Sequence, residues 1–199
     1  MDGLRVLIGE DDPVEAEGFR LILEGLGYSV VGLAHDGRDA VAKVESLAPT
    51  LVFLDIRMPR LDGIEATREI MACCPVPIIL VTGHSEPDLI EKAIAAGVMG
   101  YLMKPLDHMD LRPTIAVALA RFADLMTLRK DVRTIKEALA QRRDLERAKG
   151  ILASRMRLGE NEAHRRLQQL AQRERCTLAE AAGRVIVQDK FYADLERLT

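Results

Sequence analysis

The feature that most constrains the fold is a short apolar run that ends on a carboxylate. Residues 50–54 are almost wholly apolar and β-prone, and Asp55 follows them directly. Such a run is typical of a strand buried on both faces of a parallel sheet. Met58-Pro59 and Asp62-Gly63 then interrupt the chain before a helical pattern begins at Ile64. In open α/β sheets ligands bind at the carboxyl ends of strands, so Asp55 is a candidate for chemistry.

Similar runs recur along the first 120 residues, with helical patterns between them. The predicted strands are 5–9, 30–34, 50–54, 78–82 and 100–103, and the predicted helices are 14–24, 38–46, 64–72 and 87–96. Alternating strands and amphipathic helices predict an α/β fold with a doubly wound, five-stranded parallel sheet.

Polar side chains gather where these strands end. They are Glu10, Asp11 and Asp12 after the first strand, Asp55 after the third, Thr82 at the fourth and Lys104 after the fifth. Crowded carboxylates repel one another unless a cation joins them, and hard oxygen ligands favour Mg²⁺. A metal, a hydroxyl and an ammonium group together suit a phosphoryl group. Taken alone, Asp55 could equally be a residue that caps the turn.

This constellation resembles the receiver domain of bacterial two-component response regulators, which is of the flavodoxin-like type. The resemblance covers roughly residues 4–120 and rests on these matching pieces: Glu10-Asp11, Asp55, the tail 58–63, Thr82, Tyr101 and Lys104-Pro105. It implies that Asp55 accepts a phosphoryl group from a sensor histidine kinase.

The resemblance also implies a role for each residue around Asp55. Asp11, Asp55 and the backbone carbonyl of Arg57 would bind Mg²⁺, and Glu10 would assist through a water molecule. Asp12 would be a third acid of the site, and its alternative role is to begin the helix near Pro13.

Three further residues complete the implied switch. Lys104 and Thr82 would contact the phosphoryl oxygens, and Thr82 and Tyr101 would change position together on phosphorylation. The Lys104-Pro105 peptide bond is expected to be cis.

Charge divides the chain into two halves. Residues 1–120 hold 10 Lys and Arg against 19 Asp and Glu, a net charge of −9, whereas residues 121–199 hold 18 against 12, a net of +6. The asymmetry suggests an acidic module joined to one that meets a polyanion. Solvated helix faces are the alternative explanation for the basic residues.

From Leu111 the pattern becomes one long helix, with neither Pro nor Gly between Thr114 and Lys149. Its apolar residues continue at alternating four- and three-residue spacing through Leu128, Val132, Ile135 and Leu139. This spacing is typical of a short coiled coil, so Val132, Ile135 and Leu139 are predicted to form the seam of a homodimer on activation. Packing of the helix on its own domain is the alternative.

Two more helices are expected after Leu158-Gly159: one over 160–173, and one that begins at a capping box formed by Thr177 and Glu180. The predicted organisation is a receiver over 1–120, a coiled-coil linker over 121–140 and a small three-helix bundle over 141–199.

The basic half resembles the ANTAR domain, an RNA-binding module of transcription antiterminators, over roughly residues 129–190. The matching residues are Leu139, Arg142, the run 148–152 (Ala-Lys-Gly-Ile-Leu), Ala163, Leu167, Ala171, Leu178 and Ala182. Ala153 departs from the methionine usual there. The resemblance implies binding of RNA hairpins and prevention of transcription termination, and the candidate contacts are Arg142, Arg143, Lys149, Arg155, Arg165 and Arg166.

Other classes of function fit the sequence less well. A DNA-binding response regulator is the main alternative, but no clear second helix of a helix-turn-helix follows residues 177–182. The basic half holds no catalytic grouping, so the chain is predicted not to be an enzyme beyond phosphoryl uptake and loss on its own side chain. No membrane-spanning or signal segment is apparent, and three cysteines without a framework spacing predict a cytoplasmic protein.

Overall fold

The computed structural model describes residues 3–83 and 87–196, and it divides into two compact units over residues 1–127 and 128–199. The first unit confirms the predicted sheet, whose five parallel strands lie in the order β2-β1-β3-β4-β5. The strands are β1 (Arg5–Gly9), β2 (Ser29–Ala34), β3 (Leu51–Asp55), β4 (Ile78–Thr82) and β5 (Gly100–Met103).

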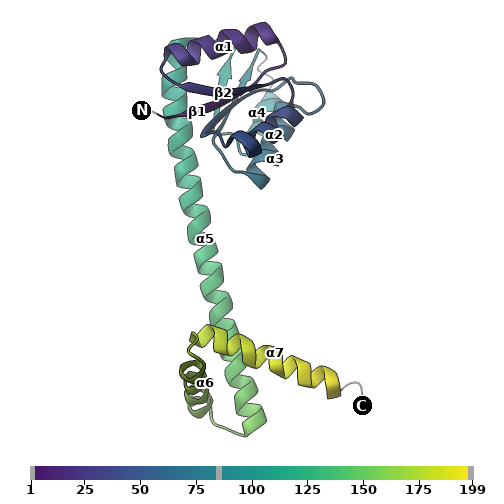
Figure 1. Cartoon of the computed structure of the whole chain (residues 1–199), viewed down its shortest axis with the longest axis vertical. Helices are drawn as coiled ribbons and strands as arrows, with labels where there is room; N and C mark the ends of the chain where they lie inside the picture. Colours follow the sequence, from purple (N-terminus) through teal and green to yellow (C-terminus); the bar gives the residue numbers. More distant parts are fainter. Residues whose placement is uncertain (1–2, 84–86, 197–199) are drawn as a thin grey trace. The chain divides into compact units, whose positions relative to one another are not determined.

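Helices cover both faces of this sheet. They are α1 (Pro13–Gly25), α2 (Gly37–Leu47), α3 (Gly63–Cys73), α4 (Pro87–Ala96) and the first part of α5 (His108–Met156). Figure 1 shows α1 on one side of the sheet and α2 and α3 on the other. Leu111, Ile115 and Ala118 of α5 are buried in the same core as the sheet, and Arg112 donates to the carbonyl oxygen of Leu26 after α1.

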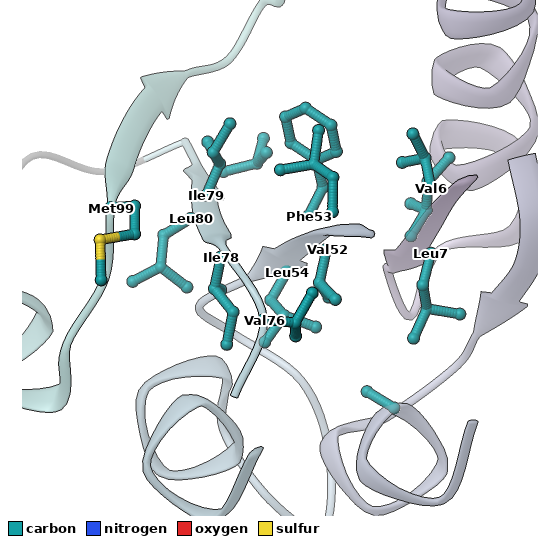
Figure 2. Close-up of a cluster of buried hydrophobic side chains, with 14 of the residues drawn as sticks. Val6, Leu7, Val52, Phe53, Leu54, Val76, Ile78, Ile79, Leu80 and Met99 are labelled. Carbon is teal, nitrogen blue, oxygen red and sulfur yellow. The ribbon is translucent and has the colours of Figure 1, made fainter. Parts of the chain in front are cut away.

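The buried strands send alternate side chains to opposite faces. Leu7, Val52 and Ile78 lie in register and point to one face, whereas Phe53 and Ile79 point to the other (Figure 2). Phe53 meets Phe19 of α1 edge to face, with ring centroids 4.9 Å apart. Because both faces of β3 are buried, its first four residues, 51–54, can all be apolar without alternation, which is why the run 50–54 predicts a strand.

The described part of the second unit consists of helices joined by short turns. The end of α5 packs with α6 (Glu160–Glu174) and α7 (Leu178–Glu196) around a small core of Ala148, Leu167, Ala171, Ala181, Ala182 and Val185. The predicted capping box is present: the Thr177 N–H donates to the Glu180 carboxylate at 2.7 Å, and the Glu180 N–H donates to the Thr177 hydroxyl at 3.2 Å. None of the described helices has the length and apolar character needed to cross a bilayer.

One glycine fixes how the chain leaves β3. Gly63 begins α3, its N–H donates to the Ile56 carbonyl oxygen at 2.9 Å, and a Cβ placed there would collide with the backbone carbonyl of Asp55. Gly63→Ala should therefore destabilise the fold by roughly 1–3 kcal/mol in urea titrations, because the β3–α3 turn cannot give way without moving Asp55.

Gly18→Ala is the matched control. Gly18 lies inside α1 with open space around it, so its substitution should stabilise the protein by about 0.5–1 kcal/mol. A Gly63→Ala protein as stable as the parent would contradict the close approach of α3 to Asp55.

Candidate functional site

The sheet brings the predicted polar residues together at one edge. The strand order reverses between β1 and β3, and in such sheets the crevice for a ligand lies at the carboxyl ends of the two strands that flank the reversal. Glu10 and Asp11 directly follow β1, and Asp55 is the last residue of β3. Thr82 ends β4, and Lys104 follows β5.

Carboxylates crowd this edge. Glu10 is 6% exposed and Asp55 is 8% exposed, whereas Asp11 is open to solvent. One ligand oxygen from each of these three residues lies within 4.8 Å of the others. Burying two carboxylates side by side is unfavourable without a cation, and oxygen atoms this close fit the ligand set of a divalent ion such as Mg²⁺.

Lys104 supplies a cation from the protein itself. Its Nζ lies 2.6 Å from Asp55 Oδ2, 2.6 Å from Glu10 Oε2 and 2.5 Å from Glu15 Oε2. Its backbone N–H donates to the Thr82 carbonyl at 2.8 Å, and the Lys104-Pro105 bond is cis. Burial opposes the charge on Lys104, but the hydrogen bonds that its ammonium group donates to the three carboxylates outweigh burial and raise its pKa. The ammonium group is therefore held charged against Asp55.

The pKa of Glu10 is also shifted by burial and by the neighbouring charged groups. Desolvation raises the pKa of Glu10 above its usual value of 4.5, the nearby Asp55 carboxylate raises it further, and the hydrogen bond from Lys104 opposes both. The second oxygen of Asp55, Oδ1, accepts the backbone N–H of Arg57 at 3.1 Å. Asp55 is thus positioned by one backbone donor and one ammonium group.

Asp12 caps a helix, whereas Glu15 is the acid that contacts Lys104. Asp12 is the N-cap of α1, where its Oδ1 accepts the N–H groups of Val14 at 2.7 Å and Glu15 at 3.2 Å. Glu15, which the sequence analysis did not single out, contacts Lys104 from the first turn of α1. The only sequence signal for Glu15 was its place one turn after the acidic run.

Thr82 and Tyr101 lie on the neighbouring strands β4 and β5. Thr82 is 1% exposed, and Tyr101 is half-buried. Burial raises the pKa of the Tyr101 hydroxyl, and a side-chain hydrogen bond with Thr82 partly opposes the rise. The two predicted switch residues are thus linked directly.

In the helical bundle, the motif residues are mostly structural. Ala148, Ala163 and Leu167 are completely buried. The side chain of Lys149 is only 13% exposed, and its Nζ contacts Glu146 at 2.8 Å and Glu160 at 3.1 Å. Lys149 therefore ties α5 to the start of α6, a role that its helical neighbours alone did not reveal.

The arginines predicted to contact RNA differ in whether a carboxylate of the same chain already binds them. Arg155 is held by Asp189 of α7 at 2.9 Å, and Arg165 and Arg166 each lie 3.7 Å from Glu162 while remaining exposed. Arg142 and Arg143 are exposed and make no salt bridge among the described residues. With Lys136 they line one surface depression on α5.

The predicted seam residues are uncovered. Val132 is 43% exposed, Ile135 59% and Leu139 61%. These three side chains belong to neither of the two hydrophobic cores.

Comparison with known proteins identifies both units. Residues 6–116 match the family model of the response regulator receiver domain, and residues 133–186 match that of the ANTAR domain. The transcriptional regulatory protein PdtaR of Mycobacterium tuberculosis is 40% identical over 182 residues, which cover 92% of this chain and 89% of PdtaR.

Other relatives share the first unit alone. The transcriptional regulatory protein ZraR of Escherichia coli is 36% identical over 120 residues, 60% of this chain and 27% of ZraR. The signal receiver domain of the putative response regulator NarL from Mycobacterium tuberculosis superposes with a TM-score of 0.57 at 28% identity, covering 60% of this chain and 98% of that domain.

The raised pKa of Glu10 predicts how stability changes with pH. A group whose pKa is higher in the folded than in the unfolded chain favours folding below pH 4.5, and that contribution is lost as the pH rises through the folded pKa. Glu10→Gln cannot titrate, so in chelator-containing buffer its free energy of unfolding should fall less than that of the parent from pH 4.5 towards neutral. Urea titrations at several pH values measure this, and parallel curves for the two proteins would contradict it.

Proposed function

Because this chain belongs to the response regulators that join a receiver domain to an ANTAR domain, we propose that phosphorylation of Asp55 controls its binding to RNA. The observation that carries the proposal is the geometry around Asp55. A buried carboxylate at the end of β3 lies beside two further acids and 2.6 Å from a lysine ammonium group. A sensor histidine kinase is the proposed phosphoryl donor.

A magnesium ion fits the three acids of the site. Asp11, Asp55 and the backbone carbonyl of Arg57 would hold it directly, and Glu10 would do so through water. When bound, Mg²⁺ would offset the negative charge that the carboxylates and the phosphoryl group bring together. The fit rests on three carboxylates whose oxygens converge and whose repulsion only a cation can relieve.

The chain's own residues carry out the transfer. A carboxylate oxygen of Asp55 attacks phosphorus, the bond from phosphorus to the kinase histidine breaks, and an acyl phosphate forms on Asp55. Lys104, already 2.6 Å from Asp55, would pair with the new phosphoryl oxygens, and the Thr82 hydroxyl would donate to another. Hydrolysis of the same acyl phosphate would reset the site, and we propose no other turnover.

Thr82 would pass the change on to Tyr101. The side-chain hydrogen bond between Thr82 and Tyr101 supports a linked movement, because a shift of the Thr82 hydroxyl towards the phosphoryl group would disturb this contact. Tyr101 would then turn inward. The face formed by β4, β5 and their helices would change shape and favour a homodimer, whose helical linker over 121–140 presents Val132, Ile135 and Leu139.

The output is RNA binding by the bundle over 141–199, which would hold hairpins in nascent transcripts and prevent termination. Support comes from the ANTAR match and from the exposed arginines at Arg142, Arg143, Arg165 and Arg166. Lys149 and Arg155 would act through the bundle, because both are held by carboxylates within it. A DNA-binding output is not favoured, since residues 133–186 match the family model of the ANTAR domain.

Asp55→Asn should abolish phosphorylation by a small acyl phosphate in the presence of Mg²⁺, because an amide is a poor nucleophile. Intact-mass measurement of the phosphorylated fraction checks this. Asp12→Asn is the matched control: it removes a neighbouring carboxylate but keeps a good N-cap for α1, so it should still be phosphorylated. Labelling of Asp55→Asn at the parent's rate would remove Asp55 as the acceptor.

Arg142→Ala and Arg143→Ala should each weaken binding of a hairpin RNA and reduce the slope of log affinity against log salt by about 1, because one phosphate contact is lost. Arg38→Ala is the control, since it removes the same charge from the receiver, where Arg38 pairs with Glu69. Filter binding at several salt concentrations, with duplex DNA of equal length as competitor, measures both quantities. An affinity loss with an unchanged slope would assign these arginines a structural role instead.

A further inference from the structure

Two cysteines and a glutamate meet at the ends of two helices of the first unit. Cys73 is the last residue of α3, Cys74 follows it as the C-cap, and Glu45 lies near the end of α2. One ligand atom from each residue, a sulfur or a carboxylate oxygen, lies within 4.8 Å of the other two. Glu45 and Cys73 are exposed and Cys74 is half-buried, so solvent reaches this thiol cluster.

The fold holds the thiol cluster in place. The helices α2 and α3 lie side by side on one face of the sheet, where Arg38 of α2 pairs with Glu69 of α3 at 2.7 Å (Figure 1). Cys74 leaves the helical conformation, with φ −137° and ψ 73°, while its N–H donates to the Ile70 carbonyl oxygen at 2.8 Å. Its side chain packs partly on the core of the first unit. The bend that brings two successive thiols to one carboxylate is therefore fixed by the surrounding structure.

Adjacent cysteines are poorly placed for a disulfide with each other. Consecutive Cα atoms across a trans peptide bond lie about 3.8 Å apart, whereas a disulfide usually joins Cα atoms about 4.4–6.8 Å apart. Both thiols are free in the structure. A ligand that both sulfur atoms share would bind them without this strain.

The helix ends favour a cation at this place. The C-terminal end of a helix carries a partial negative charge, so a carboxylate there is unfavourable unless a cation lies nearby. Glu45 lies near the end of α2 and forms no salt bridge within the described part of the chain. The last turn of α3 contains no basic residue.

The mixture of sulfur and oxygen atoms selects the metal. Mg²⁺ and Ca²⁺ prefer ligand sets made of oxygen alone, whereas Zn²⁺ binds both cysteine sulfur and glutamate oxygen. Because each Zn–S bond is about 2.3 Å long, two thiolates on one ion lie at most about 4.6 Å apart. The ligand atoms of the thiol cluster lie within 4.8 Å of one another, so small side-chain rotations would bring them to this spacing.

We propose that Glu45, Cys73 and Cys74 bind one Zn²⁺ ion, with water as the fourth ligand. The ion would join the C-terminal ends of α2 and α3. This site is separate from the acids at Asp55, because α3 begins near that edge at Gly63 and its 11 residues extend roughly 16 Å. Its ligands take no part in the chemistry proposed at Asp55.

Cobalt tests the site, because its spectrum reports thiolate ligands directly. Full-length, reduced protein in excess Mg²⁺, which fills the acids at Asp55, should bind one Co²⁺ ion with the near-ultraviolet absorption of thiolate-to-cobalt charge transfer. Zn²⁺ should displace the cobalt at one equivalent, since a tetrahedral thiolate site favours zinc.

Single substitutions assign the three ligands. At saturating Co²⁺, Cys73→Ser and Cys74→Ser should each reduce the charge-transfer absorption by about half and weaken Zn²⁺ binding at least about 10-fold, because each removes one thiolate. Glu45→Gln should weaken Zn²⁺ binding to a similar degree and keep the absorption. Circular dichroism verifies that each variant is folded, and Cys74→Ala repeats the Cys74 measurement with an apolar side chain at the core.

Cys176→Ser is the matched control, since Cys176 lies in the second unit and should affect neither the absorption nor the affinity. A parent protein without the charge-transfer absorption would overturn the proposal. Absorption that survives in both Cys73→Ser and Cys74→Ser at the parent's level, or that is lost in Cys176→Ser, would do the same. An unchanged Zn²⁺ affinity in Glu45→Gln would exclude the carboxylate and with it the three-ligand site.

Protection of the thiols from alkylation is a second measurement on the unmodified sequence. One equivalent of Zn²⁺ should slow alkylation of Cys73 and Cys74 about 10-fold, because a metal-bound thiolate is a poor nucleophile, and Mg²⁺ should not. Cys176 in the same sample serves as the internal control, and peptide mass spectrometry distinguishes it from the adjacent pair. Equal protection of all three thiols, or protection by Mg²⁺, would contradict a zinc site at the thiol cluster.

Discussion

The ion pairs between Lys104 and the carboxylates of Glu10 and Asp55 are the constraint on which the site depends. The strands must be apolar on both faces to be covered by helices, and this burial leaves the acids at their ends poorly solvated. Removing the partner of a buried charge costs several kcal/mol, so the acids require a cation at all times. Lys104 provides it when no metal is bound, and the same ammonium lies where a phosphoryl group on Asp55 would need it.

The same constraint bears on the proposed switch. Lys104 is anchored by its backbone to Thr82, and Thr82 is bonded through its side chain to Tyr101. In the proposed switch, a change in charge at Asp55 would reach the β4–β5 edge through these two contacts. Buried strands are tightly packed and resist gradual deformation, so the change is expected as an exchange between two arrangements of these side chains.

The fold was largely predictable because its signals are local. Strands β1, β4 and β5 have the predicted bounds, since each apolar run ends on or directly before a polar or glycine residue. Strand β2 begins one residue earlier than predicted, and β3 lies one residue later. Contacts between elements distant in sequence were not predictable. Glu15 meets Lys104 across 89 residues, and Lys149 meets Glu160 across the α5–α6 turn. An isolated basic residue looks the same in sequence whether it faces a phosphate or a carboxylate, so Lys149 was predicted as an RNA contact although the structure ties it within the bundle.

Burial of side chains does not explain why the middle of α5 is helical. Residues 127–144 bury no side chain, yet they contain neither Gly nor Pro and are rich in Leu, Ala, Arg and Lys, which favour helix formation. Helix propensity alone would not require any apolar residue on the surface of this stretch. Apolar residues at Leu128, Val132, Ile135 and Leu139, flanked by acids on one side and bases on the other, lower solubility unless they are sometimes covered. The homodimer proposed above would cover them in one state and leave them exposed in the other.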